Sequence, residues 1–380
     1  LLFHLLTRLM ILILTQCFPS RVGGIESLVS NLALGLGKKE KVIVFADRHH
    51  IFYDAIFDNQ HKDQVLIRRV GGIKFFRRRK KIKEIRPFIE SKQVKLVLVD
   101  TWKSIELGID YLNRKKIPVI CLAHGNDLIS HNKNKMKRIH QTLNKVSSVV
   151  ANSIFTKNLL KNIINSQVNL TTIYPGAVDL NSMKKEKILG LTGSPILLTL
   201  ARLEKRKGHL EIINSIHKLI PQFPNIQYII AGIGPELKNL KKIVKDRKLE
   251  KYVIFVGKVN DYQKKYLFEK TELMIMPTID ETEKGSIEGF GIVYIEAAFF
   301  SIPSIASNVG GTPEAVIDNS TGKIINKIDD IFATIQELLL NQNKIKKLGQ
   351  NAKKRALEEF TWDRVTNKYL SLIKVIDKTM

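Results

Sequence analysis

Short apolar runs separated by amphipathic stretches recur along nearly the whole chain, and this alternation constrains the fold more than any other feature. Most of the runs are continuous in Val, Ile and Leu, as strands that are covered on both faces require. The predicted strands are 10–15, 41–46, 96–99, 119–123, 148–151 and 170–174, then 195–201, 227–231, 252–256, 273–276 and 304–306. The clearest predicted helices between them are 25–36, 208–219 and 236–245. Because right-handed crossovers between such units give parallel sheets, the sequence predicts an α/β fold.

The two series of strands predict two doubly wound, Rossmann-like domains. A chain of 380 residues is too long for one compact domain and suits two. Apolar periodicity is lost over 181–194, where charged, Gly, Ser and Pro residues take over. We therefore predict one domain over 1–185 and a second over 190–361, followed by a separate helical pattern at 361–380.

The apolar start of the chain and its cysteines bear on cellular location. Residues 1–15 are interrupted by His4 and Arg8, fall short of a bilayer span, and lack a basic leader and cleavage site. We interpret 9–15 as a buried strand and the residues before Met10 as a gene-start extension. Cys17 and Cys121 form no close pair, which argues against a disulfide framework or zinc site and suits a reducing cytosol.

Positive charge is concentrated in the first half of the chain. The net charge is +26, and residues 1–190 carry 33 Lys and Arg against 14 Asp and Glu, whereas the remainder carries 29 against 22. This asymmetry suggests a polyanionic partner, which is a nucleic acid, an anionic membrane or a phosphorylated substrate. A general drift toward lysine in the source proteome is the alternative explanation.

Two glycine-containing or basic turns follow predicted strands, where doubly wound domains bind ligands. In the turn 20–26, Gly23 and Gly24 precede a helix, which favours close approach of an anion, although a tight turn alone also requires glycine. In the turn 201–208, Arg202 and Lys207 are suited to bracketing a diphosphate. The alternative for the second turn is a run of solvated charges.

Two further turns follow strands of the second series. Gly232 and Gly234 form only part of a dinucleotide-binding fingerprint, so a packing turn is the simpler interpretation of that segment. Segment 288–296 is more specific, because Glu288 precedes a Gly-x-Gly turn, a helix begins near Gly291, and Glu296 follows in its first turns. Amides at 290–292 are placed for a phosphate, Glu296 for ribose hydroxyls and Glu288 for sugar hydroxyls. A simple interaction of Glu296 with the helix dipole is the alternative.

Motifs spread over nearly the whole chain resemble the retaining family 4 glycosyltransferases of the GT-B type. The segments that carry this resemblance are GGIE at 23–26, HGND at 124–127, ANS at 151–153, YPG at 174–176, ARLEKRKG at 201–208, AGIGPE at 231–236, EGFGIVYIE at 288–296, PSIA at 303–306 and GGTPE at 310–314. The spacing of Glu288 and Glu296, with GGTPE soon after, is the most specific of these.

The resemblance implies a GT-B fold, with two Rossmann-like domains, an interdomain cleft, and a C-terminal helix at 362–380 that crosses back to join the first domain. It implies that Glu296 binds the nucleotide ribose and Glu288 the donor sugar. The implied catalytic residues are His124, Arg202, Lys207 and Glu288. The implied donor-binding residues are Gly23, Gly24, Gly232, Gly234, Gly257, Phe290, Gly291, Ile292 and Glu296. His124 follows the fourth predicted strand and is expected beside the donor sugar.

No D-x-D motif occurs in the sequence, so we expect no metal ion and no cofactor, with fixed cations stabilising the departing diphosphate. HExxH, GxSxG and P-loop motifs are likewise missing from the sequence. The chain departs from the family pattern in an acidic extension at 280–287, which resembles phosphatidylinositol-mannosyltransferase-like members and favours a mannosyl donor. It departs again at Ser301, where glycine is usual, and we interpret this as a packing variation.

The densest basic cluster, Arg77, Arg78, Arg79, Lys80 and Lys81, is predicted to lie on a helix with its cations outward. Phe75, Phe76, Ile82, Ile85 and Ile89 approximate one apolar stripe on that helix. A basic helix with aromatic residues is typical of binding to an anionic membrane. A second basic patch over 131–138 is suited to a phosphorylated lipid acceptor. Ordinary solvated helix faces are the alternative for both patches.

We therefore predict an enzyme that transfers a sugar, with retention and without metal, from a UDP- or GDP-sugar to a lipid-linked or glycan acceptor in envelope polysaccharide or lipopolysaccharide synthesis. Its expected location is cytoplasmic, on the inner face of the membrane. One alternative is another Rossmann nucleotide-binding enzyme, but the glycine fingerprint at 231–236 is incomplete. Another is a nucleic-acid-binding protein, for which no recognition module is present. An inactive relative is disfavoured by the intact acidic and basic motifs.

Overall fold

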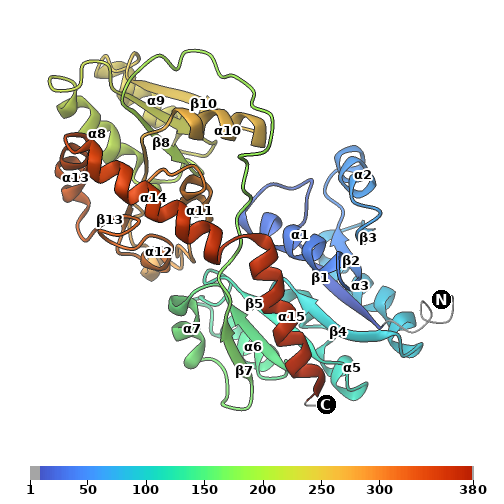
Figure 1. Ribbon diagram of the computed structural model, residues 1–380. Helices are drawn as coiled ribbons and strands as arrows, with labels where there is room; N and C mark the ends of the chain where they lie inside the picture. Colours follow the sequence, from blue (N-terminus) through green and yellow to red (C-terminus); the bar gives the residue numbers. More distant parts are fainter. Residues whose placement is uncertain (1–8, 379–380) are drawn as a thin grey trace. The chain divides into compact units, whose positions relative to one another are not determined.

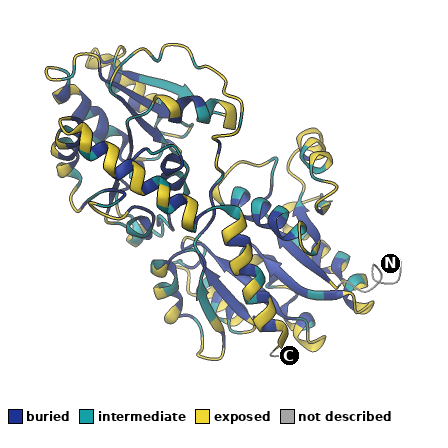
Figure 2. Ribbon diagram, viewed as in Figure 1, coloured by how far each residue is buried: buried dark blue, intermediate teal, exposed yellow. Residues whose placement is uncertain are grey.

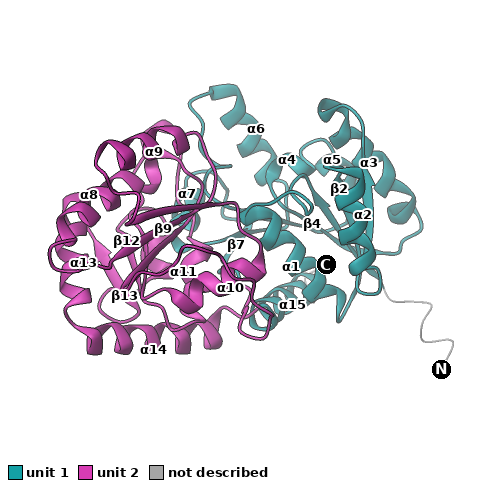
Figure 3. Ribbon diagram, turned by 90° about the horizontal axis from the view of Figure 1, so that it is seen from above, with its two compact units in different colours: residues 1–176, 362–380 teal, residues 177–361 magenta. Residues whose placement is uncertain are grey.

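The structure, a computed structural model, describes residues 9–378 and contains two compact units. Unit 1 comprises residues 1–176 and 362–380, and unit 2 comprises residues 177–361 (Figure 3). The proposed extension before Met10 falls mostly outside the described residues. Within 9–378 no helix is long and apolar enough to cross a membrane.

Unit 1 is built on a seven-stranded sheet in which every paired strand is parallel, in the order β3-β2-β1-β4-β5-β6-β7. Its strands are β1 (Met10–Thr15), β2 (Lys41–Asp47), β3 (Leu66–Val70), β4 (Val94–Val99), β5 (Val119–Ala123), β6 (Ser148–Ala151) and β7 (Asn169–Thr172). Its helices are α1 (Gly24–Gly37), α2 (Ile51–Gln60), α3 (Lys74–Glu90), α4 (Trp102–Ile105), α5 (Ile109–Arg114), α6 (Lys133–Leu143), α7 (Ile154–Lys161) and α15 (Trp362–Lys378). Figure 1 shows the helices flanking this sheet.

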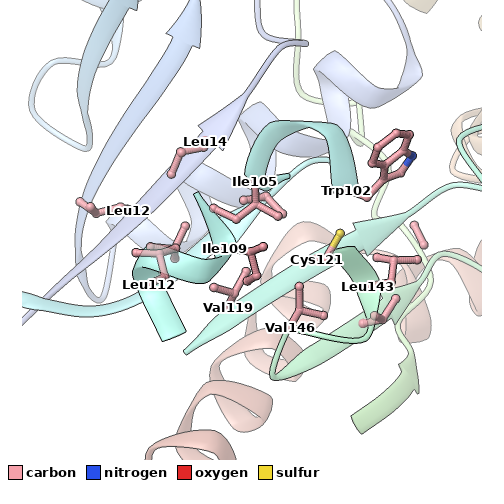
Figure 4. Packing of buried hydrophobic residues seen from close by; sticks show 14 of the residues in the cluster. Leu12, Leu14, Trp102, Ile105, Ile109, Leu112, Val119, Cys121, Leu143 and Val146 are labelled. Atoms are coloured by element: carbon pink, nitrogen blue, oxygen red, sulfur yellow. The ribbon is translucent and has the colours of Figure 1, made fainter. Parts of the chain in front are cut away.

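The alternation of side chains along β1 explains why the unit 1 sheet is covered on both faces. Leu12 and Leu14 enter a core that includes Trp102 of α4 and Leu112 of α5 (Figure 4). Ile11 and Ile13 enter a second core on the other face, where the strands pack against α1 and α15. The C-terminal helix α15 is therefore part of unit 1, although its sequence follows unit 2.

Unit 2 contains a six-stranded parallel sheet in the order β10-β9-β8-β11-β12-β13. Its strands are β8 (Ile196–Leu200), β9 (Gln227–Ala231), β10 (Val253–Gly257), β11 (Leu273–Met276), β12 (Ser304–Ser307) and β13 (Gly322–Ile325). Its helices are α8 (His209–Leu219), α9 (Leu237–Asp246), α10 (Asp261–Lys270), α11 (Ile292–Ala298), α12 (Thr312–Ala315), α13 (Ile331–Leu339) and α14 (Gln342–Glu359). Figure 2 shows that the strands of both sheets are largely buried, whereas exposed residues follow the outer sides of the helices.

The predicted α/β fold with two doubly wound units is confirmed, and the predicted strands all exist with ends shifted by at most two residues. Two strands were missed, β3 and β13, and both lie at a sheet edge. Edge strands lose the continuous apolar pattern, and β3 carries Arg68 and Arg69 in its centre. His124 consequently follows the fifth strand of its sheet and not the fourth.

The segment 181–194 packs on unit 2 through Gln227 and Tyr262, so the units divide at 176/177.

Candidate functional site

The strand order of the unit 2 sheet reverses between β8 and β11, and doubly wound sheets bind ligands at such a point. The loop after β8 supplies Lys207, and the loop after β11 supplies Glu288. The two side chains meet, because Lys207 Nζ donates a hydrogen bond to Glu288 Oε2. The sequence thus predicted two residues 81 positions apart that the fold brings into direct contact.

Glu288 contacts a second cation as well. Arg206 Nη1 lies 3.1 Å from the same Glu288 Oε2, and all three side chains are at most 14% exposed. Burial alone would raise the pKa of Glu288, but the positive charges and hydrogen bonds of Lys207 and Arg206 outweigh it and lower the pKa. Glu288 is therefore a carboxylate that accepts hydrogen bonds from two cations, with further lone pairs available for hydroxyl groups.

The turn at 310–311 fixes the backbone of Glu288. Gly311 N donates to Glu288 O at 2.9 Å, and a Cβ at Gly310 would lie 2.2 Å from the same oxygen. Gly310 also has a φ of +59°, which favours glycine. The first two residues of the GGTPE motif therefore contact the backbone of Glu288 directly and help to position it.

Glu296 lies on α11 and pairs with a residue that the sequence did not predict. Lys264 Nζ, from α10, is 2.9 Å from Glu296 Oε1. The start of α11 is fixed by Gly291 at φ +90° and by Tyr294, whose hydroxyl donates to Met276 O at 2.7 Å. Glu296 is 14% exposed, so it is mostly enclosed but still reachable from solvent.

The other predicted donor residues of unit 2 have different surroundings. Arg202 is 76% exposed and pairs with Glu204 at 3.0 Å, whereas Lys207 is enclosed and pairs with Glu288. Gly232 and Gly234 pack against residues 201–203, where a Cβ on either would meet a backbone oxygen. Gly257 is the last residue of β10, and a Cβ there would meet nothing within 4 Å. The side chain of Phe290 is buried and its ring packs on that of Phe360.

In unit 1, Gly23 and Gly24 begin α1, as the sequence predicts. The buried carboxylate of Glu26 turns back over Gly23, where Oε2 would lie 2.3 Å from a Cβ on that glycine. Glu26 Oε1 also pairs with Arg21 Nε at 2.8 Å. An anion that approaches this helix start therefore meets both a cation and a carboxylate.

His124 is largely buried beside the end of β4. Its Nε2 is 2.8 Å from Asp100 O, and because a carbonyl oxygen accepts only, this contact places a proton on Nε2. Asp127 Oδ1 accepts from His124 N at 2.9 Å, and burial raises the pKa of Asp127. The imidazole is thereby held in one orientation, with Nδ1 as the remaining functional atom.

The basic helix α3 differs from the prediction in two respects. Lys81 is fully buried and donates to Thr15 O at 2.6 Å while pairing with Asp47 at 2.7 Å, so it is a core residue and not a membrane contact. Phe75 and Phe76 are 63% and 52% exposed, so they do not continue the buried apolar stripe. The prediction failed at these positions because the buried residues of this seventeen-residue helix all lie at or after Lys81, in its later turns.

The remaining cations of the cluster divide into two pairs. Arg77 and Arg78 are partly buried and pair with Asp47 and Glu106, respectively. Arg79 and Lys80 are exposed.

Among the described residues, no group of three or more His, Cys, Asp and Glu side chains is arranged to hold a metal ion.

Comparisons with known proteins agree with the two-unit architecture. Residues 22–181 match the model of Glycosyltransferase Family 4, and residues 182–355 match the model of Glycosyl transferases group 1. A GDP-mannose-dependent alpha-(1-6)-phosphatidylinositol monomannoside mannosyltransferase of Mycolicibacterium smegmatis is 22% identical over 92% of this chain and 94% of its own. An N-acetyl-alpha-D-glucosaminyl L-malate synthase of Bacillus anthracis is 23% identical over 67% of each chain.

Solved structures give the same fold. The structure of HepE from Anabaena in complex with UDP and glucose has a TM-score of 0.78 at 19% identity, over 97% of this chain and all of that one. A glycosyltransferase from Rickettsia africae has a TM-score of 0.77 at 19% identity, over 99% and 100% of the two chains. The two alternative interpretations, another Rossmann enzyme and a nucleic-acid-binding protein, are therefore set aside. The chain belongs to the family 4 glycosyltransferases and has their GT-B fold.

Proposed function

We propose that this glycosyltransferase transfers a hexose from a nucleoside diphosphate sugar, with the donor held by unit 2. The observation that carries this proposal is the contact of Glu288 with Lys207 and Arg206 at the reversal point of the sheet. A carboxylate with two adjacent cations has acceptors for sugar hydroxyls and positive charge for a diphosphate in one place. Glu296 supplies acceptors for the ribose, and the amides at 290–292 assist at the phosphate.

The departing diphosphate is proposed to be stabilised by Lys207, together with Arg202, whose exposed guanidinium would exchange its pairing with Glu204 for the ligand. Fixed cations perform this task without a metal ion, and no cofactor is required for transfer of the sugar. Arg206 joins this group because it shares Glu288 with Lys207. His124 is proposed to contact the donor sugar, and transfer is proposed to retain the anomeric configuration.

The proposed donor is a GDP- or UDP-sugar, with mannose favoured. The support comes from the acidic extension at 280–287 and from relatives whose names specify GDP-mannose. The proposed acceptor is a lipid-linked or glycan molecule of the cell envelope at the inner face of the cytoplasmic membrane. Exposed Arg79 and Lys80 of α3 support an anionic surface as the site of action.

A thermal-shift screen tests the donor assignment. Ligands that bind the folded protein raise its unfolding temperature, so UDP, GDP and their sugars are compared with the corresponding nucleoside monophosphates. We expect one diphosphate series to stabilise unit 2, with the shift unchanged by EDTA. The measurement is then repeated on Lys207→Met, which should lose most of the shift. An equal shift with monophosphates, or a shift that requires a divalent metal, contradicts the proposed donor chemistry.

A further inference from the structure

Lys264 of α10 is an enclosed ammonium group held between two carboxylates. Its Nζ lies 2.9 Å from Glu296 Oε1 and 2.8 Å from Asp261 Oδ1, and its side chain is 17% exposed. Asp261 is 53% exposed, whereas Glu296 is 14% exposed. The stronger of the two pairings is therefore the one with Glu296, because it is the better shielded from water.

The charge of Lys264 is maintained by these partners. Burial alone would lower the pKa of Lys264, but the charges of Glu296 and Asp261 and the hydrogen bonds to both raise it well above its ordinary range. Burying an ammonium costs several kcal/mol unless it is paired. The two carboxylates therefore offset the cost of enclosing Lys264 and keep its ammonium charged beside Glu296.

Hydrogen bonds hold the first turn of α10, and thereby the backbone of Lys264, in a fixed conformation. Asn260 and Gln263 form a capping box, with Gln263 N donating to Asn260 Oδ1 at 2.9 Å and Asn260 N donating to Gln263 Oε1 at 3.1 Å. Both side-chain amides also donate to Glu186, at 3.1 Å and 2.7 Å. Lys264 N donates to Asn260 O at 2.8 Å, which completes the turn.

The geometry matches what a vicinal diol requires. Two hydroxyl groups need two acceptor sites, and a carboxylate offers about four, of which Lys264 occupies one on Oε1. An ammonium has three donors, and the two carboxylates leave one for a hydroxyl oxygen. Lys264 also offsets the negative charge of Glu296, which would otherwise repel an approaching diphosphate.

We propose that Lys264 is a positioning residue of the donor site, which fixes Glu296 for recognition of the ribose 2′ and 3′ hydroxyls and supplies a third N–H to one of them. This inference rests on the proposed ribose role of Glu296. The competing explanation is that the lysine only ties α10 to α11. If Lys264 only links the two helices, its loss should change the affinity for all nucleotides equally. If it positions Glu296, its loss should change only the affinity for nucleotides that carry the two hydroxyls.

The test compares UDP and GDP with their 2′,3′-dideoxy forms by isothermal titration calorimetry. The proteins are the wild type, Lys264→Met, Glu296→Gln, the double variant, and Lys270→Met as the control. Lys270 lies on the same helix but is exposed. Methionine keeps the aliphatic stem of lysine and removes the charge, so packing is largely retained.

We expect the wild type and Lys270→Met to prefer the ribose form by about tenfold or more, as hydrogen bonds to a charged group imply. Lys264→Met should lose most of this preference, and the double variant should lose no more than Glu296→Gln alone. A preference that survives in Lys264→Met, with both forms weakened equally, overturns the inference and leaves the proposed function intact. Failure of the wild type to bind either diphosphate contradicts the proposed function itself.

Discussion

Glu288 is held by two cations, and this determines what its removal should do. The Glu288→Gln variant loses the negative charge with which Lys207 and Arg206 both pair. The two cations themselves remain near the proposed diphosphate position. We expect the affinity for the nucleoside diphosphate to be unchanged or higher. The value of kcat/KM should fall by about 10- to 100-fold, because strong hydrogen bonds to the sugar are lost.

Calorimetry with the diphosphate and initial rates with the sugar donor measure these two quantities separately. Glu283→Gln, in the same loop but exposed, serves as the control and should resemble the wild type. A variant that loses diphosphate affinity in parallel with rate would show that Glu288 acts on the nucleotide and not on the sugar.

Ser301 departs from the family pattern at a position with a backbone cost. It has a φ of +60°, in the left-handed region, where a residue with a Cβ is disfavoured by about 1 kcal/mol or more. Ser301→Gly should therefore raise the free energy of unfolding by up to about 1 kcal/mol, after the greater freedom of glycine in the unfolded chain is counted. Urea unfolding measures the change, and Ser301→Ala, which keeps the strain, should not show it. A lower midpoint for the glycine variant would refute the argument.

For individual residues of the donor site, the sequence predicted those that belong to a local motif. It missed residues that come to the site from another part of the chain or without an assigned role. Glu288 and Glu296 lie within one short segment, whose pattern is specific. Lys264 lies on a different helix, in a run of polar residues that is indistinguishable from a solvated surface. Arg206 lies inside the segment 201–208, but the family resemblance assigned roles there only to Arg202 and Lys207, and a third cation in a basic run gives no further signal.

At the scale of elements, α8 begins with a buried histidine that links stability to pH. His209 contacts Tyr228 Oη at 3.2 Å and Arg202 O at 3.4 Å. Burial lowers its pKa to about 4 from 6.5. The unfolded chain therefore takes up a proton before the folded chain does as the pH falls below 6.5. Stability should decrease from there to about pH 4, by roughly 3 kcal/mol in total.

His209→Gln isolates this effect, because the amide keeps a donor and an acceptor but does not titrate in this range. We expect its urea midpoint to fall less steeply than that of the wild type between pH 6.5 and pH 4.5. Carboxylates contribute equally to both proteins, so the difference between the two curves is the relevant quantity. Superimposable curves would exclude His209 as the cause.

Helices and strands could be predicted from the sequence where their residues are buried, and less well where they are exposed. Central strands such as β1 and β5 are buried throughout and, apart from Thr15, apolar, because helices cover both of their faces. The edge strand β3 was missed because its alternating exposure leaves no continuous run. Helix α3 was placed correctly, and Ile82, Ile85 and Ile89 are buried as predicted, but Phe75 and Phe76 are exposed because only the later turns of the helix are covered.

At the scale of the whole molecule, the excess positive charge of residues 1–190 suggests a polyanionic partner, and burial decides which cations are available to one. Lys81 is enclosed and bonds Thr15 and Asp47, so it contributes nothing at the surface. Arg77 and Arg78 are paired with carboxylates. Arg79 and Lys80 are exposed, and they follow the exposed rings of Phe75 and Phe76. Cations beside exposed aromatic rings are suited to an anionic membrane surface.

The last prediction concerns these two cations. Replacing Arg79 and Lys80 with Gln should weaken sedimentation with anionic liposomes by about tenfold or more, since each cation near such a surface is worth on the order of 1 kcal/mol. The control replaces exposed Lys346 and Lys347 of α14 with Gln, which removes the same charge from unit 2. Hydrolysis of a soluble donor should be unchanged in both variants. The two variants have the same net charge, so only a localised binding surface can make their liposome binding differ. Equal losses of binding in the two variants would mean that total charge, and not this surface of α3, governs binding.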